Sequence, residues 1–332
     1  MMILGVEGTA HTFGIGITDG KEILANARDI YRPEKGKGIH PTEASEHHKK
    51  VKESVLEAAL KEANIQMSDI STIAYSCGPG LPPCLRITCD FTKHLSAEYN
   101  IPIIPVNHPV AHIEIGRFAC KAKDPIVVYV SGGNTQIIGY SQGRYRVFGE
   151  TLDIAIGNAR DMFIREATGE FPGGPVVDRL ANNGKERYDA RGVGSFIELP
   201  YVVKGMDLSY SGILTETIKK LKAGTNIEDL AFSFSETTFA MLCEVAERAL
   251  AHTNKNELML VGGVAASPHL QRMMKIMCEE RGAQFHVVPP QFAGDNGAMI
   301  AWTGFLSSES ISAKNADFYP RQRVDDVEIT WI

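Results

Sequence analysis

Long apolar runs, a basic amino-terminal segment and closely spaced cysteine pairs are all missing from this 332-residue sequence. Without about 18 consecutive apolar residues, no helix is expected to span a membrane. The first residues, MMILGVEGTA, do not resemble a secretory signal. The six cysteines contain no Cys-x-x-Cys pair, which argues against a zinc finger or a disulfide framework. We therefore expect a cytoplasmic protein with reduced thiols and no contact with a membrane.

A surplus of basic residues is also missing. The chain has 34 lysines and arginines against 40 aspartates and glutamates, a formal net charge of -6. This balance excludes a generally basic nucleic-acid binder, so any contact with RNA must be local. The content of 44% hydrophobic and 22% charged residues is that of a globular protein, and the length suffices for two domains with their own cores.

Predicted strands and helices alternate along most of the chain. Three strands are expected in residues 2–31 and three more in 125–150, and each set is followed by alternating helices and strands. After the first set comes a polar loop at 33–38. The pattern predicts an α/β protein of two lobes, residues 1–124 and 125–332, with a cleft between them and the last helix packed back on the first lobe.

Two kinds of chemistry meet in the middle of the chain. His108 and His112 are four residues apart, so on a helix both imidazoles face one side and are able to bind a single ion. The small residues Ser131 to Gly133 follow an apolar strand and let backbone N–H groups approach phosphate oxygens. The alternatives are two buried core histidines and an ordinary hairpin.

Glycine turns in both opening hairpins, and a late Gly-Gly-Val-Ala-Ala turn, are the layout of the actin, sugar-kinase and heat-shock ATPase superfamily. Within it the sequence closely resembles the tRNA threonylcarbamoyladenosine transferases, bacterial TsaD and the catalytic subunit of the archaeal and eukaryotic KEOPS complex. The resemblance implies a two-lobed actin-like α/β fold, a duplicated ribonuclease-H-like unit, with the active site in the cleft. The segments that carry it include GVEGTAHTFGIGI (5–17), GIHPTEASEHH (38–48), VNHPVAHIEIG (106–116), YVSGGNTQ (129–136), FPGGPVVDRLA (171–181), LVGGVAAS (260–267) and GDNGAMIAW (294–302).

The resemblance implies a metal ion held by His108, His112, Tyr129 and Asp295. Two imidazoles and two oxygen donors suit a divalent ion, and the tyrosine favours Fe²⁺ over Zn²⁺. Taken without the resemblance, Tyr129 is an aromatic residue of a strand and Asp295 a residue at the start of a helix.

The resemblance also implies a bound nucleotide, either threonylcarbamoyladenylate or an ATP-like or AMP-like molecule. Asp161 and Asp178 are expected to accept hydrogen bonds from ribose hydroxyls; the alternative is that both are solvated helix carboxylates. The family usually has Glu at position 178, Asn at 267, and Gly at Pro82 in a loop that is expected to contact a partner. The implied nucleotide-binding residues are Tyr129, Val130, Ser131, Gly132, Gly133, Asp161, Gly174, Asp178 and Ser267.

The implied reaction transfers threonylcarbamoyl from the adenylate to N6 of the adenosine 3′ of the anticodon in tRNAs that read ANN codons. It forms t6A and releases AMP. Because the mixed anhydride is already activated, the enzyme needs no Ser or Cys nucleophile, only orientation, charge stabilisation and removal of a proton. Glu7 and His11 are the candidate catalytic proton acceptors, and the alternative for Glu7 is a carboxylate that stabilises its turn.

The implied partners are tRNA and the KEOPS subunits, namely a small atypical protein kinase, a dimerising subunit and a kinase-binding subunit. Two alternatives remain: an actin-like ATPase or small-molecule kinase, and a non-catalytic scaffold of a kinase complex. A His-Glu-x-x-His metalloprotease is excluded because Pro109 replaces the glutamate. The helix that carries His47, His48 and Lys49 is interpreted as a solvated charged face rather than a tRNA contact.

Overall fold

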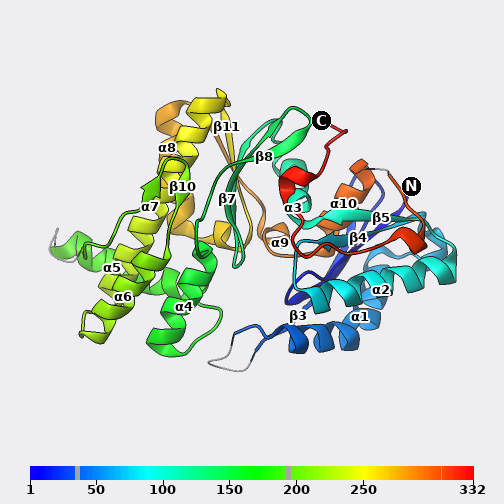
Figure 1. Cartoon of the computed structure of the whole chain (residues 1–332), viewed down its shortest axis with the longest axis horizontal. Helices are drawn as coiled ribbons and strands as arrows, with labels where there is room; N and C mark the ends of the chain where they lie inside the picture. The colour runs from blue at the N-terminus through cyan, green and yellow to red at the C-terminus, as the bar shows by residue number, and fades with distance from the viewer. Residues whose placement is uncertain (34–37, 192–195, 308) are drawn as a thin grey trace.

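The computed structural model describes residues 1–33, 38–191, 196–307 and 309–332, so most of the predicted polar loop at 33–38 lies outside the described residues. Two five-stranded sheets form the frame (Figure 1). The first has the order β3-β2-β1-β4-β5, and its strands in chain order are β1 (Ile3–Glu7), β2 (Thr12–Thr18), β3 (Ile23–Ile30), β4 (Thr72–Gly78) and β5 (Ile103–Asn107). The second has the order β12-β11-β6-β7-β8, with β6 (Ile126–Val130), β7 (Thr135–Ser141), β8 (Arg144–Glu150), β11 (Glu257–Val261) and β12 (Gln284–Val287).

The two sheets follow one plan. In the first, β1, β2 and β3 are antiparallel, and β4 and β5 join parallel to β1. In the second, β6, β7 and β8 are antiparallel, and β11 and β12 join parallel to β6. The strands predicted from the hydrophobic pattern and their duplicated arrangement are confirmed. The exact division into lobes at residue 124 stays a prediction.

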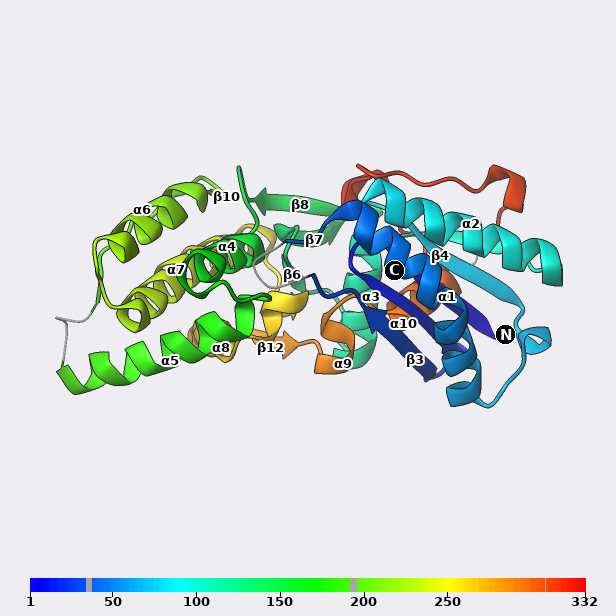
Figure 2. The ribbon, with the colours of Figure 1, turned by 90° about the horizontal axis from the view of Figure 1, so that it is seen from below.

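Helices separate and cover the sheets in five layers (Figure 2). The first sheet carries α1 (Pro41–Ala63) and α2 (Pro82–Tyr99) on its outer face. Between the sheets lie α3 (His108–Cys120), the short α9 (Pro290–Ala293) and α10 (Gly297–Ser307). The second sheet is covered by α4 (Ile156–Thr168), α5 (Gly174–Arg191), α6 (Ser211–Lys222), α7 (Ile227–Thr253) and α8 (Pro268–Arg281). A small hairpin of β9 (Val203–Lys204) and β10 (Asp207–Leu208) lies beside β8.

The middle layer is a shared hydrophobic core. It joins Ala74 of the first sheet and Val127 of the second to Ile113 of α3 and Ile300 of α10. Separate cores lie on the outer faces of the two sheets. Since one apolar cluster contacts both sheets, the base of the space between them is closed by packing.

Local sequence fixes the start of α3, the helix that carries the histidine pair. The side chain of Asn107 accepts a hydrogen bond from the backbone N–H of Val110 at 3.1 Å, and Pro109 stands in the first turn, where its missing N–H is not needed. The helix ends at Lys121, which has a left-handed backbone. The same rule explains why Pro82 is tolerated, because it is the first residue of α2.

The amino-terminal half of α10 lies with its backbone directly against β1 and β2. A Cβ atom built on Gly16 would lie 2.2 Å from the backbone nitrogen of Ala298, and one on Gly5 would lie 2.2 Å from that of Ala301. From the helix side, a Cβ on Gly297 would lie 2.1 Å from the nitrogen of Gly16. Only glycine allows this approach, which also places the residues just before α10 beside the first sheet.

The environment of His48 differs from the prediction, and the path of the carboxy-terminal segment was not predicted. His48 is fully buried under the turn that follows β1, so the interpretation of its helix face as wholly solvated was wrong there. Burial lowers the pKa of His48 to about 4. The carboxy-terminal residues 309–332 cross from the first sheet, where Ile311 pairs with Ile103, to β8. Among the described helices, none is long and apolar enough to cross a bilayer.

The contact between α10 and β2 predicts a large loss of stability for Gly16→Ala. The added methyl group meets backbone atoms that cannot rotate away, so we expect the free energy of unfolding to fall by about 3 kcal/mol. Gly212→Ala in α6 is the control, because a Cβ there meets nothing within 4 Å and alanine favours a helix. Thermal unfolding should show a midpoint below that of the wild type for Gly16→Ala and not for Gly212→Ala. Equal midpoints for the two variants would contradict the close contact between α10 and β2.

Candidate functional site

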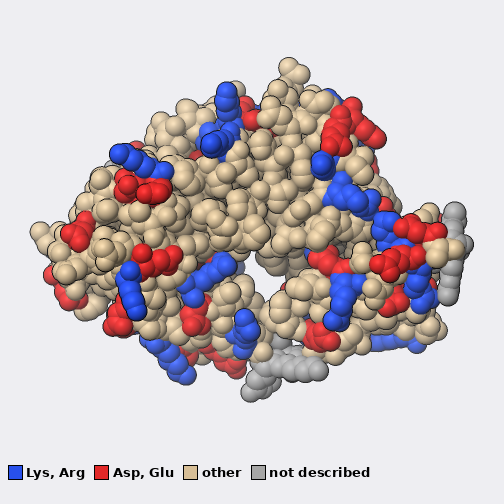
Figure 3. Space-filling view, turned by 180° about the vertical axis from the view of Figure 1, so that it is seen from behind, with Lys and Arg blue, Asp and Glu red and all other residues tan. Residues whose placement is uncertain are grey.

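A cavity of about 600 Å³ lies between the two sheets. From the first sheet it is lined by the turn Thr9 to Thr12 and by Arg28, and from the second by Tyr129 and the turn Ser131 to Asn134. His108 and Asp295 form part of its wall. Seen from behind, the molecule is hollowed between its two halves, and basic and acidic side chains are interspersed around the opening (Figure 3). The cavity is therefore the cleft that the sequence predicts.

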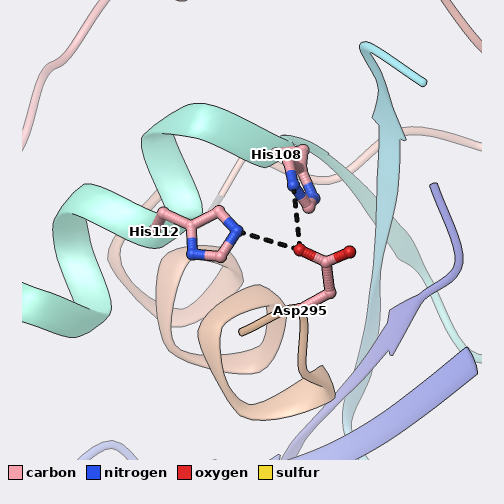
Figure 4. Close-up of side chains that lie close together, drawn as sticks. All are labelled: His108, His112 and Asp295. Carbon is pink, nitrogen blue, oxygen red and sulfur yellow. Dashed lines mark hydrogen bonds and ion pairs between the residues drawn. The ribbon is translucent and has the colours of Figure 1, made fainter. Parts of the chain in front are cut away.

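Three predicted metal ligands converge at the wall of this cavity, which His108 and Asp295 line and beside which His112 is buried. His108 and His112 extend from α3, and Asp295 extends from the segment before α10 (Figure 4). The Oδ1 atom of Asp295 lies 3.5 Å from Nε2 of His108 and 3.2 Å from Nε2 of His112. One donor atom from each of the three residues lies within 4.8 Å of the others.

The spacing of these donors fits a shared ion. Ligand atoms bonded to a tetrahedral ion at about 2.1 Å lie about 3.4 Å apart. The observed separations of 3.2 and 3.5 Å match that value. The donor set of two imidazoles and one carboxylate is one that transition metals prefer. The residues present therefore fit a divalent metal ion.

Glu7 orients the first histidine. Its side chain is fully buried; one oxygen accepts hydrogen bonds from the backbone and the hydroxyl of Thr9, and the other lies 3.1 Å from Nδ1 of His108. Burial alone lowers the pKa of His108, but the Glu7 carboxylate outweighs it and raises that pKa to about 9. With its Nδ1–H donated to Glu7, the ring presents Nε2 towards Asp295. It would bind an ion there as the neutral imidazole, after Nε2 has lost its proton.

The other ligands are held in a poorly hydrated environment. Burial lowers the pKa of His112 and raises that of Tyr129 above its ordinary value. Burial also opposes ionisation of Asp295, yet its contacts with the two histidines keep its pKa well below the usual range. The ring of Tyr129 lies 5.3 Å from that of His112, between centroids, and its hydroxyl oxygen accepts a hydrogen bond from the side chain of Asn134 at 3.4 Å.

The turn after β6 is open towards the cavity. Its backbone is closed by a hydrogen bond from Ser131 N–H to the carbonyl of Asn134 at 2.8 Å. A Cβ on Gly132 or Gly133 would meet nothing within 4 Å, so no protein group fills the space in front of them. Backbone N–H groups without side chains beside them form a suitable cradle for phosphate oxygens.

The remaining predicted nucleotide residues form a second cluster, in which Arg160 is central. The guanidinium of Arg160 donates to the carbonyl of Gly174 at 2.9 Å and pairs with Asp178 at 2.6 Å. The hydroxyl of Ser267 donates to the same carboxylate oxygen of Asp178 at 2.6 Å. Asp161 accepts from the N–H of Gly173 at 2.7 Å. The cluster thus links α4, α5 and the start of α8.

The structure sorts the predicted residues into three places. Tyr129, Ser131, Gly132 and Gly133 line the cavity with His108 and Asp295, whereas Val130 is buried in β6. His11 also lines the cavity, while Glu7 lies beneath it. The ribose-binding candidates lie in the Arg160 cluster.

Two residues at these sites were missed. Thr9 joins Glu7 to the metal centre, and Arg160 holds the carboxylate of Asp178. No spacing in the sequence marks either residue, because each acts through a partner far along the chain.

Comparison with known proteins gives a consistent result. The profile of the tRNA N6-adenosine threonylcarbamoyltransferase family matches residues 22–302. A Thermococcus gammatolerans protein of that name is 52% identical over 335 residues, with 100% of both chains covered. A Methanothermobacter thermautotrophicus protein named probable bifunctional tRNA threonylcarbamoyladenosine biosynthesis protein is 47% identical; the match covers 100% of this chain and 61% of that protein.

Similarity in three dimensions extends further than similarity in sequence. T. kodakarensis HypF has a TM-score of 0.60 at 14% identity, and the match covers 92% of this chain and 47% of that one. At this identity the likeness is one of fold alone. Together with the two sheets of equal strand order, it confirms the predicted two-lobed, actin-like α/β class.

The contact between Glu7 and His108 predicts that Glu7→Gln weakens metal binding. A neutral amide neither fixes the Nδ1 proton as firmly nor raises the basicity of the ring. Loss of such an outer-shell carboxylate typically lowers metal affinity by about 10- to 100-fold. Competition against a chelator, with Fe²⁺ and Zn²⁺ in turn, measures the affinity.

The matched control is Glu114→Gln. Glu114 is a buried carboxylate on the same helix as the two histidines, but it bonds to Tyr145 and Arg117 instead. We expect the Glu114→Gln variant to bind the metal with the same affinity as the wild type. Equal affinity for the Glu7 and Glu114 variants would show that Glu7 does not support the metal centre.

The bond between Ser267 and Asp178 predicts that two departures from the family pattern are energetically coupled. Asp178→Glu alone pushes a longer side chain against Ser267, and Ser267→Asn alone crowds Asp178. We expect each single variant to weaken AMP binding and the double variant to recover part of the loss. The coupling should be about 0.5–3 kcal/mol in a double-mutant cycle measured by calorimetry. Strictly additive losses would contradict it.

Proposed function

The chain belongs to the tRNA N6-adenosine threonylcarbamoyltransferase family, and from that premise we propose that it transfers threonylcarbamoyl from L-threonylcarbamoyladenylate to tRNA. The acceptor is N6 of the adenosine 3′ of the anticodon in tRNAs that read ANN codons, and the products are t6A and AMP. The observation that carries the proposal is the convergence of His108, His112 and Asp295 at the wall of a cavity that the glycine turn also lines.

In the transfer step, N6 of adenosine attacks the carbamoyl carbon. The bond between that carbon and the phosphate oxygen breaks, AMP leaves with the oxygen, and a proton is lost from N6. The backbone N–H groups of Gly132 and Gly133 would stabilise the negative charge on the leaving phosphate, whereas that of Ser131 is engaged by the carbonyl of Asn134. Holding both substrates in one cavity supplies the orientation that the reaction needs.

We assign the proton acceptor to His11 rather than to Glu7. His11 lines the cavity, whereas both oxygens of Glu7 are engaged by Thr9 and His108. A base must reach the proton that it removes, and a cavity-lining imidazole meets that condition. Glu7 would instead keep His108 in the tautomer that binds metal.

We propose that His108, His112, Asp295 and Tyr129 hold one divalent ion, with Fe²⁺ favoured over Zn²⁺. A phenol oxygen beside two imidazoles and a carboxylate supports iron. When bound, the ion supplies a Lewis acid for the carbamoyl or phosphate oxygen. The nucleotide would lie between the glycine turn and the Arg160 cluster. There Asp161 and Asp178 would accept hydrogen bonds from the ribose hydroxyls.

We further propose that the chain acts in the cytoplasm with KEOPS partners, including a small atypical kinase. The relative from M. thermautotrophicus is named as bifunctional, and this chain spans 61% of its length, which fits a fusion to a second catalytic unit. The six cysteines are free, as expected in a reducing compartment. The kinase and scaffold alternatives are disfavoured, since the matching family is one of transferases and the predicted metal ligands converge.

The proposal predicts that His108→Ala and His112→Ala abolish transfer. The assay follows labelled threonylcarbamoyl from its adenylate to unmodified tRNA, with partner subunits added. Each variant removes an imidazole donor, so we expect both bound metal and the transfer rate to fall by at least about 100-fold. The metal content of the purified proteins is measured in parallel.

His94→Ala is the control, because this histidine is exposed on α2, away from the cavity lining, and pairs with Glu98. It should transfer at the wild-type rate. If the wild type hydrolyses ATP without transferring the label, the kinase alternative is favoured. If the two metal-centre variants transfer as fast as the wild type, the assignment of the metal to the reaction is wrong.

A further inference from the structure

Arg28 stands at the mouth of the cavity. It is an exposed residue near the end of β3, and it pairs across the sheet with Gly14 of β2. Its guanidinium NH1 donates to the main-chain carbonyl of Asp295 at 3.3 Å. Arg28 lines both the central cavity and a smaller adjoining one of about 360 Å³. Its charge is therefore held at the entrance, close to the metal candidate.

This charge is distinctive within the cleft. Among the described residues that line the central cavity, Arg28 is the only lysine or arginine. Among the described residues Arg28 forms no ion pair, although Glu62 lines the smaller cavity with it and acidic residues outnumber basic ones in the sequence. Most of its five N–H donors are thus available to an external anion, and the planar fork suits phosphate oxygens.

The net charge of the chain disfavours RNA binding, whereas the proposed reaction requires it. A net charge of -6 provides no general attraction for a polyanion, so the contacts with RNA have to be few and placed at the site of reaction. When N6 of the acceptor adenosine reaches the cavity, its sugar and the flanking phosphates stay at the mouth. Arg28 is an exposed basic residue on the wall of that cavity.

We propose that Arg28 binds a backbone phosphate of the tRNA anticodon loop beside the acceptor adenosine. This inference rests on the proposed function and adds to it a residue that positions the RNA. The contact is with the backbone, so it contributes affinity and register but carries no information about the base sequence. The hydrogen bond to Asp295 holds the arginine in place for this contact.

The test measures equilibrium binding of an unmodified anticodon stem-loop to the metal-loaded protein with its partners, across a series of KCl concentrations. Loss of one contact with a single-stranded phosphate reduces the slope of log Kd against log[KCl] by about 0.7. We expect this reduction for Arg28→Gln, a wild-type slope for Arg28→Lys, and the same loss for stem-loops of different anticodon sequence. Arg146→Gln, at an exposed position on β8, is the control and should keep the wild-type slope.

Three outcomes would overturn the inference. An unchanged slope for Arg28→Gln shows that no phosphate is bound there. A loss of bound metal in that variant shows that Arg28 serves to hold Asp295. Loss of binding for one anticodon sequence alone shows a contact with a base. The binding assay does not depend on transfer, so a wild type that binds RNA with the expected slope but transfers nothing contradicts the proposed function and leaves this inference standing.

Discussion

The backbone contact between α10 and the first sheet is the constraint on which the site depends. Asp295 is 183 residues away from His112, and it reaches the histidine only because Gly297 and Gly16 allow the helix to lie against β2. On the opposite side of α10, the shared middle core holds α3 against both sheets. The two ligand-bearing segments are thus fixed by packing, and the site does not have to provide the energy that brings them together.

The charges at the centre depend on one another in the same way. Glu7 is fully buried, and a buried carboxylate without a partner is very costly, so it requires the hydroxyl of Thr9 and the ring of His108. His108 and His112 in turn stabilise the ionised form of Asp295. A divalent ion between the imidazoles and Asp295 would balance two carboxylates in a region from which water is largely excluded. The arrangement therefore supports the proposed metal site over a set of core histidines.

The sequence predicted the helices and strands well from the periodicity of apolar residues, and the family from motifs that cover most of the chain. The spacing of His108 and His112 places them on one face of a helix whatever the rest of the chain does. Glu7 could not be assigned in this way, since nothing in the sequence distinguishes a carboxylate that acts as a base from one that orients a metal-binding histidine. The prediction for His48 was wrong for a related reason. Its charged neighbours in the sequence indicate a solvent-exposed helix face, but its own side chain is buried beneath the turn at Gly8. Contacts between distant segments are what a single sequence does not reveal.

The metal centre and the nucleotide candidates belong to different parts of this packing. Asp178, Ser267 and Arg160 bond to one another within the second half, whereas Glu7 and Asp295 are tied to the first. Movement of one half against the other would therefore change the distance between the two clusters and leave each intact. That movement is limited at the base by the shared core. It is limited further by residues 309–332, which bond to Asn107 and to Arg144 on their way across. The relative position of the two clusters is therefore held by the middle core and by the carboxy-terminal segment, whereas the contacts within each cluster do not depend on it.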